Sequence, residues 1–226
     1  LHAGAPVVAQ GGDWSMESGG ESSLLYSDRY GHLALPRPGM VGQHQIGNAG
    51  LAVAMLRQQV VLPVSPAAMA SGVRLARWPA RMQQLPPGAL TQRLPSGSTL
   101  WLDGGHNPNA GAAIAETLMA ANVEDVHLII GMVLNKDAAG FIAPFAPRLA
   151  SLSAVPITGH DHHDPEQLCA DAASQLGIPN CTSARTVGDA LARMVANHGA
   201  VQPLHILIAG SLYLAGEVLK ANGTLP

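Results

Sequence analysis

The chain has 226 residues, of which 47% are hydrophobic and 12% charged, a length and composition that allow a sizeable core and exclude global disorder. Its net charge of −3 and pI near 6.4 lack the basic footprint with which proteins bind nucleic acid or anionic membranes. No apolar run reaches the roughly 18 residues of a membrane span, and the N-terminus has no signal-peptide pattern. We expect one domain with an appendage or two small domains, and neither nucleic-acid nor membrane partners.

The first 40 residues are polar and rich in glycine and turns. Two short strands are predicted on either side of Ser27 and Asp28, with Pro36 ending the second. The pattern changes near residue 41, so a domain-scale change is expected there. The chain begins with Leu, not Met, inside a pattern that already indicates folded structure, and we expect that an N-terminal part precedes it.

Two helices are predicted after the change of pattern. The nearly all-apolar run GQHQIGNAGLAVAMLRQQ, residues 42–59, indicates a helix packed on most of its sides. The segment SPAAMASGVRLARW predicts a second helix, with Ser65 as its N-cap and Pro66 at its first position.

From residue 98 onward, short apolar strands alternate with helices, which predicts an α/β domain with a Rossmann-like, mostly parallel sheet and helices on both faces. Right-handed crossovers place the carboxyl ends of all the strands at one edge, where ligands bind in such sheets. The strands are TLWLD, VHLIIGM, LSAVPI, LHILIAG and a weaker one near NCTSA, and the helices span 108–121, 136–149, 164–176, 186–197 and 211–221.

The stretch LDGGHNPN lies at that edge, where a strand gives way to a helix. A carboxylate at the end of a buried strand loses its solvation, so Asp103 should bind a hydroxyl, a metal or an arginine. The two glycines that follow allow backbone N–H groups to approach an anion. His106 suits either a functional role or a plain loop, and Asn107 suits either a ligand contact or an N-cap preceding Pro108.

Two further junctions carry polar side chains. Ser211, after the strand LHILIAG, is either an N-cap or a ligand contact. Asn135 or Asp137 caps the helix after GMVL, and Lys136 between them is either near a phosphate or solvated.

The loop GHDHHDP, residues 159–165, crowds three histidines and two aspartates together. Their nearly contiguous positions lack a spacing that would surround one ion, so we predict a solvated loop and no metal site.

Two more side chains suit a nucleotide. In WPARMQ, Trp78 and Pro79 impose an extended approach, so that Arg81 projects from a rigid segment able to grip phosphate or stack on a base. Asn48, near a helix start, offers the donor and acceptor that a purine edge requires.

Cysteine and lysine are both scarce. Cys169 and Cys181 are too few for a disulfide framework, so they are expected to be ordinary buried or partly buried thiols in a reducing cytosol. The only lysines, Lys136 and Lys220, do not lie in G-x-x-x-x-G-K-[ST], so this sequence contains no phosphate-binding P-loop.

The segments GQHQIGNA, WPARMQ, LDGGHNP, GMVLNKD and GSLYLAGEVL occur in the order found in folylpolyglutamate synthase/dihydrofolate synthase, of the muramyl-ligase-like superfamily. The chain resembles the bacterial bifunctional enzymes of this family over nearly its whole length, and its forms of WPARMQ and WLDGGHNP resemble alphaproteobacterial ones. Ala80 stands where the wider family often has glycine.

The resemblance implies a cytoplasmic ligase that uses ATP and Mg²⁺ to add L-glutamate to dihydropteroate or to a tetrahydrofolate polyglutamate through an acyl phosphate. It implies a monomer when full length, with the P-loop and the magnesium ligands in an N-terminal ATPase domain. Residues 1–40 would be the β-rich tail of that domain, and residues 41–226 would be the C-terminal glutamate-ligase domain. This chain alone is then expected to be inactive.

By match to the family motifs, Asn48, Arg81 and Asp103 would contact ATP. His106 and Ser211 would act on the glutamate side as catalytic residues, with His44, Asn107 and Lys136 as supporting residues. The alternatives are another muramyl-type amino-acid ligase, or a stand-alone, non-catalytic module that binds a nucleotide or an amino acid.

Overall fold

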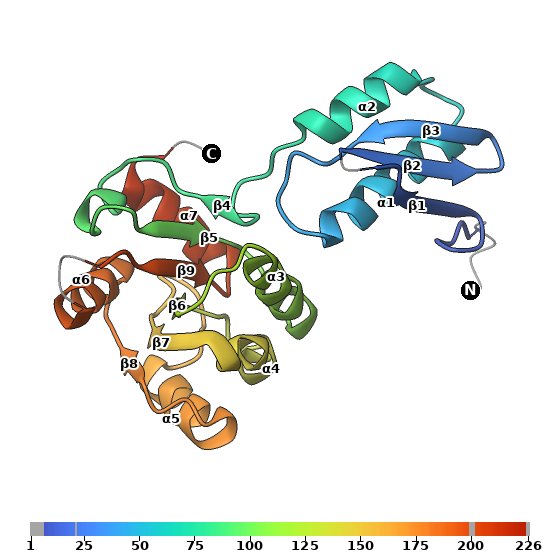
Figure 1. The fold of residues 1–226 in the computed structure, drawn as a ribbon. Coiled ribbons are helices and arrows are strands. Elements are labelled where there is room, and N and C mark those ends of the chain that lie inside the picture. The colour runs from blue at the N-terminus through green and yellow to red at the C-terminus, as the bar shows by residue number, and fades with distance from the viewer. Residues whose placement is uncertain (1–6, 21, 199–201, 225–226) are drawn as a thin grey trace. The chain divides into compact units, whose positions relative to one another are not determined.

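The structure, a computed structural model, describes residues 7–20, 22–198 and 202–224. The chain forms two compact units, Leu1–Trp78 and Pro79–Pro226. Each unit is described by itself (Figure 1).

The first unit contains a three-stranded antiparallel sheet in the order β1-β2-β3. The two strands predicted around Ser27 and Asp28 are confirmed, and β1 is an additional strand. Asp28 stabilises the hairpin turn because its Oδ1 accepts the N–H of Tyr30 at 2.8 Å. The strands are β1 Trp14–Ser18, β2 Ser23–Asp28 and β3 Gly31–Pro36.

Helices α1 His44–Gln58 and α2 Pro66–Leu75 share one hydrophobic core with these strands. The predicted cap of α2 is confirmed, since the Ser65 hydroxyl oxygen accepts the Ala68 N–H at 3.2 Å. The expectation that α1 is packed on most sides is wrong, because Leu51 and Met55 are 49% and 67% exposed. A small sheet and one neighbouring helix bury only one face of α1.

Along the chain, the boundary between the two compact units falls between Trp78 and Pro79, whereas the sequence pattern changes near residue 41. The reason is that α1 and α2 complete the core of the small sheet, so contacts group residues 41–78 with the strands before them. This division by contacts does not test the predicted boundary near residue 40 between an N-terminal and a C-terminal domain, which stays a prediction.

The second unit is built on a six-stranded sheet in the order β4-β5-β9-β6-β7-β8. All its pairings are parallel except that between β4 and β5, so the predicted α/β class with a mostly parallel sheet is confirmed. The five predicted strands are present and β4 is an addition. The bounds are β4 Gln83–Gln84, β5 Thr99–Leu102, β6 Val126–Ile130, β7 Leu149–Ala154, β8 Cys181–Ser183 and β9 His205–Ala209.

The helices of this unit follow the strands as predicted, with one difference. The expected helix 136–149 is a short α4 followed by a 3-10 segment, because Pro144 and Pro147 lack the N–H groups that an α-helix requires. The bounds are α3 Pro108–Ala120, α4 Ala138–Ile142, η2 Ala143–Arg148, α5 Pro165–Leu176, α6 Val187–His198 and α7 Leu212–Asn222, with a 3-10 turn, η1, at Thr91–Arg93.

Alternating residues of the central strands form two separate cores, one on each face of the sheet. Ile206 and Ile208 of β9 pack with α6 and α7, whereas Leu207 and Ala209 pack with α3, α4 and α5. Because successive strand side chains point to opposite faces, a strand that is apolar at every position needs a helical layer on both sides. The near-continuous apolar run of β9 meets that condition.

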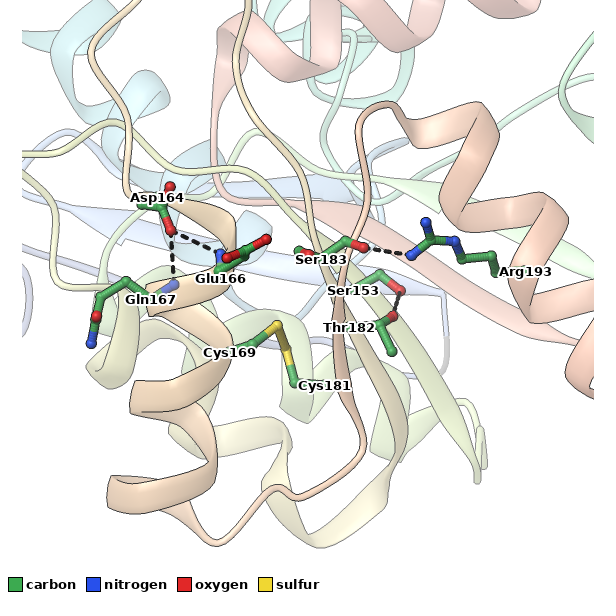
Figure 2. The surroundings of a disulfide bond; sticks show 9 residues. All are labelled: Ser153, Asp164, Glu166, Gln167, Cys169, Cys181, Thr182, Ser183 and Arg193. Carbon is green, nitrogen blue, oxygen red and sulfur yellow. Dashed lines mark hydrogen bonds between the residues drawn. A yellow bond between two sulfur atoms is a disulfide. The ribbon is translucent and has the colours of Figure 1, made fainter.

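The two cysteines are joined in a disulfide, with their Cα atoms 5.2 Å apart (Figure 2). The expectation of ordinary thiols is therefore wrong. The fold places Cys169 of α5 against Cys181 at the start of β8, a proximity that a count of two cysteines does not predict. Within the described residues, no helix is long and apolar enough to cross a membrane.

Candidate functional site

Three strand-to-helix junctions lie side by side at the carboxyl edge of the six-stranded sheet. The Gly210 N–H, after β9, donates to the carbonyl of Gly105, after β5, at 3.0 Å. Gly210 has φ +107°, and a Cβ there would lie 2.7 Å from the carbonyl oxygen of Gly131, after β6. Glycine therefore allows the close approach of backbones that brings the three junctions together.

Asp103 ends β5 and is 5% exposed. Its Oδ2 accepts the Met82 N–H and its Oδ1 accepts the Gly105 N–H, both at 2.7 Å. Two backbone N–H groups thus replace part of the water that this buried carboxylate has lost. Backbone partners were not among those that the sequence predicted for Asp103. The predicted contact between Asp103 and ATP stays a prediction.

Arg81 lies between two residues with left-handed backbones, Ala80 at φ +54° and Met82 at φ +42°. The Gly104 N–H donates to the Ala80 carbonyl at 2.9 Å, which ties this segment to the β5–α3 junction. A Cβ on Gly104 would lie 3.1 Å from Arg81 Nη1, so the guanidinium lies beside that junction. The positive φ at Ala80 also accounts for the glycine that the resembling family often has there.

His106 is half-buried, and its Nδ1 donates to the carbonyl of Gly104 at 2.9 Å. A carbonyl oxygen only accepts, so this contact selects the tautomer with the proton on Nδ1. Nε2 is then an acceptor in the neutral ring and a donor in the protonated ring. The protonated form suits a carboxylate.

Ser211 and Asn107 both cap helices, which confirms the capping alternative for each. Ser211 is 4% exposed and its oxygen accepts the Tyr213 N–H at 3.0 Å, while the Asn107 side chain accepts the Ala110 N–H at 2.9 Å. The first turns of α7 and α3, with their N–H groups, therefore begin at the same edge of the sheet, a setting that favours anions. Roles in catalysis or ligand support stay predictions.

Lys136 lies at the third junction, after β6. Asp137, not Asn135, caps α4, since its Oδ1 accepts the Gly140 N–H at 2.8 Å. Lys136 is half-buried, and its backbone carbonyl accepts a hydrogen bond from His163 Nε2 at 2.8 Å. Its contact with phosphate stays a prediction.

Asn48 and His44 lie in the first unit, on the first two turns of α1, and both are exposed. They share one partner, Gln45, which is 4% exposed. Asn48 Nδ2 donates to Gln45 Oε1 at 3.1 Å, and Gln45 Nε2 lies 3.0 Å from His44 Nε2. Within this unit, Gln45 orients both predicted residues, a role that sequence reasoning missed.

The three histidines and Asp164 of the loop 159–165 make structural contacts. His160 stacks on Tyr213 with ring centroids 3.6 Å apart, and Asp164 caps α5. His162 Nδ1 donates to the His160 carbonyl at 2.7 Å. Among residues 7–20, 22–198 and 202–224, no three or more His, Cys, Asp or Glu side chains are grouped so that they could hold a metal ion.

Gln83 is a second residue that sequence reasoning missed. Its side-chain Oε1 accepts the Ala80 N–H at 2.9 Å, directly beside the left-handed segment that carries Arg81. The only sequence signal was its place in WPARMQ, because a contact between neighbours that depends on positive φ values has no periodic pattern.

Residues 89–212 match the model of the family described as "Mur ligase, glutamate ligase domain". A probable bifunctional folylpolyglutamate synthase/dihydropteroate synthase of Haloferax volcanii is 31% identical over 178 residues, 79% of this chain and 20% of that protein. The folylpolyglutamate synthase of Lacticaseibacillus casei is 24% identical over 198 residues, 86% of this chain and 42% of that protein. The chain therefore spans less than half the length of these relatives.

Solved structures show the same fold. The structure of E. coli FolC in complex with DHPP and ADP has a TM-score of 0.75 and 26% identity, covering 96% of this chain and 47% of the other. The Mycobacterium tuberculosis folylpolyglutamate synthase complexed with ADP and AMPPCP has a TM-score of 0.75 at 22% identity, covering 96% of this chain and 49% of the other.

Proposed function

Because the chain belongs to the family of the Mur ligase glutamate ligase domain, we propose that it is the glutamate-ligase part of an ATP-dependent folylpolyglutamate synthase/dihydrofolate synthase. Its substrates would be ATP, L-glutamate and dihydropteroate or a tetrahydrofolate polyglutamate. The curated relatives named as folylpolyglutamate synthases and the FolC complex with DHPP and ADP support this proposal. A cytoplasmic location and a monomeric full-length protein belong to the same proposal.

The observation that carries the proposal is the joining of the β5–α3 and β9–α7 junctions at one sheet edge. The Gly210–Gly105 hydrogen bond joins the loop with Asp103 and His106 to the loop with Ser211. The Gly104–Ala80 hydrogen bond adds the segment with Arg81. The always-charged guanidinium of Arg81 and the N-termini of α3 and α7 thus lie at one edge of the sheet, a setting that suits phosphate and carboxylate groups.

The reaction joins a carboxylate to an amine in two steps. The γ-phosphoryl group passes from ATP to a carboxylate oxygen of the acceptor, which yields an acyl phosphate and ADP. The amine nitrogen of glutamate then attacks the acyl carbon, the C–O bond to phosphate breaks, and the nitrogen loses a proton. Alignment and charge neutralisation provide most of the rate enhancement in such transfers.

The side chains divide between the two substrates in this proposal. Arg81 would neutralise phosphate charge, and Asp103 holds the Arg81 segment while it faces the nucleotide. His106 and Ser211 would bind the carboxylates of glutamate. Mg²⁺ would neutralise phosphate charge; the described residues contain no group of three or more His, Cys, Asp or Glu side chains that could hold it.

The test is ligase activity of the intact protein that contains this chain. ATP, L-glutamate and either dihydropteroate or tetrahydrofolate should give ADP and a product heavier by one glutamyl residue, as measured by mass spectrometry. Arg81→Ala should raise the apparent KM for ATP, whereas Arg185→Ala, whose side chain is 90% exposed, should not. The 226-residue chain by itself should give no turnover.

Two other results would replace the proposal. Turnover with a muramyl acceptor in place of a pterin would indicate a different amino-acid ligase of the superfamily. Binding of nucleotide or glutamate without turnover by the intact protein would indicate a non-catalytic module.

A further inference from the structure

Resting on the proposed function, we infer that Gln83 is a positioning residue that acts on ATP through Arg81. The Gln83 side chain contacts the backbone, since its Oε1 accepts the Ala80 N–H at 2.9 Å. Arg81 lies within the turn that this hydrogen bond closes. Nothing else in the proposed chemistry uses Gln83.

The backbone around Arg81 is unfavourable without support. Ala80 and Met82 have φ values of +54° and +42°, and residues with a Cβ rarely adopt this region. Each such residue is strained and persists only where its surroundings hold it. Two of them on either side of one arginine set the direction in which that arginine leaves the chain.

Three hydrogen bonds hold the segment in this conformation. The Gly104 N–H holds the Ala80 carbonyl at 2.9 Å, and Asp103 Oδ2 holds the Met82 N–H at 2.7 Å. The Gln83 side chain holds the third group, the Ala80 N–H. Asp103 and Gly104 belong to the β5–α3 junction, whereas Gln83 directly follows the segment in the chain, as the first residue of β4.

Gln83 is itself well anchored. It begins β4 and pairs with Leu102 of β5, which is fully buried. Ala80 and Met82 are each 2% exposed, and they pack into the cores on opposite faces of the sheet. The segment therefore crosses the sheet edge with both flanking side chains buried and with Arg81 Nη1 beside Gly104.

Loss of the Gln83 acceptor should release Ala80 toward a negative φ. The Ala80 N–H would lose its partner, and the first of the two left-handed residues would lose the bond that opposes its relaxation. Arg81 would then leave the chain in a different direction, away from the β5–α3 junction. Substrates held by other side chains would be affected far less.

Steady-state kinetics of the intact ligase test the inference, with each substrate varied in turn. Gln83→Leu should raise the apparent KM for ATP about tenfold, the size expected for one lost hydrogen bond to a buried group, and change the glutamate KM less than twofold. Gln83→Glu keeps an acceptor oxygen and should stay within about threefold of the parent. Gln84→Leu, at the exposed neighbouring position, is the matched control and should behave as the parent.

The double variant decides whether Gln83 acts through Arg81. If it does, Arg81→Ala/Gln83→Leu should be no worse for ATP than Arg81→Ala alone. Hydrogen exchange of the peptide containing Ala80 should also be faster in Gln83→Leu than in the parent. Multiplied effects in the double variant would overturn the inference, as would an unchanged ATP KM in Gln83→Leu when Arg81→Ala raises it.

The inference and the proposed function fail in different ways. Absence of ligase turnover in the unsubstituted intact protein would reject the function. An unchanged ATP KM in Arg81→Ala, with turnover present, would reject the assigned role of Arg81 and with it the inference. If Gln83→Leu does not fold, Gln83→Ala removes the same acceptor and replaces it, with Gln83→Glu again as the variant that keeps an acceptor oxygen.

Discussion

Asp103, His106 and Arg81 show how backbone hydrogen bonds prepare polar side chains at the sheet edge. Asp103 accepts one backbone N–H at each oxygen, and His106 donates Nδ1–H to the carbonyl of Gly104. Arg81 is held between two left-handed residues. Each side chain is therefore oriented before any ligand arrives, which lowers the entropy that binding must overcome.

His106→Ala should raise the apparent KM for glutamate far more than that for ATP in the intact ligase. A lost hydrogen bond to a charged carboxylate costs roughly 1.5–3 kcal/mol, or about ten- to a hundredfold in KM. Varying each substrate in turn measures the split. An unchanged glutamate KM, or a change in the ATP KM alone, would make His106 a structural loop residue.

His127 is a buried histidine near the start of β6, at the edge of the sheet opposite to the strand-to-helix junctions described above. It is 2% exposed, and its Nδ1 lies 2.8 Å from Ser151 Oγ. Burial, and then the charge of His198 beside it, lowers the pKa of His127 to about 4 from 6.5; His205 lowers it further and Asp125 opposes the shift. The unfolded chain therefore binds the proton more readily than the folded one between these pH values.

Folding should weaken as the pH falls from about 6.5 toward 4, because that proton favours the unfolded state. For His127 alone the free energy of unfolding should drop by up to about 2 kcal/mol between pH 7.5 and 5. Urea titrations at both pH values should show a smaller drop in His127→Gln than in the parent, while His160→Gln, at an exposed position, keeps the full drop. Equal drops in all three proteins would assign the pH dependence to other groups.

At the scale of the elements, helices α3 and α4 pack together at a point where glycine allows their backbones to touch. Gly111 of α3 is buried, and a Cβ there would meet the Phe141 carbonyl oxygen of α4. Gly216 of α7 is also inside a helix, but a Cβ there would meet nothing within 4 Å. The two glycines are alike in secondary structure and differ only in what packs against them.

Gly111→Ala and Gly216→Ala should therefore change stability in opposite directions. Gly111→Ala forces α3 away from α4 and should lower the free energy of unfolding by about 1–3 kcal/mol. Gly216→Ala removes backbone entropy from the unfolded state and should raise it by about 0.4–1 kcal/mol. Denaturant unfolding of both variants measures the difference, and a stabilised Gly111→Ala would contradict the α3–α4 contact described.

At the scale of the whole molecule, a disulfide joins helix α5 to β8, the strand at one edge of the sheet of the second unit. Cys169 of α5 and Cys181 of β8 are 12 residues apart in the chain, and their disulfide joins the outermost parallel strand to the helix that precedes it (Figure 2). Neighbouring polar contacts support the same strand, including Ser153 to Thr182 at 3.3 Å and Arg193 to the Ser183 carbonyl at 2.6 Å.

Reduction of this disulfide should destabilise the second unit. A cross-link that closes a loop of this length lowers the conformational entropy of the unfolded chain and thereby stabilises the folded state by about 3 kcal/mol. Protein purified without reductant should contain no reactive thiol after denaturation, and reductant should lower its Tm. Cys169→Ser should show the lowered Tm without reductant and no further change with it. Two reactive thiols in the denatured, unreduced protein would show that the pair is not joined.

The sequence by itself determined the local features of this protein. Strand and helix periodicity predicted the five parallel strands and the helices that follow them, and the caps at Ser65 and Asn107 followed from residues within one turn. It also identified Asp103, His106 and Ser211 as candidates, because a strand-to-helix junction in such a sheet lies at the binding edge whatever the strand order. Arg81 was a candidate because of its place in the segment WPARMQ. These predictions depend on contacts within a few residues or on a rule of topology.

Only the tertiary structure decided which distant groups meet. The Asp103 carboxylate accepts a backbone N–H from 21 residues away, Cys169 pairs with Cys181, and α1 is buried on one face only. The strand order β4-β5-β9-β6-β7-β8 likewise brings the Ser211 junction beside that of His106, more than 100 residues earlier. Such contacts form because packing and loop closure select one arrangement among many with the same local pattern, so their physical cause lies in the whole chain.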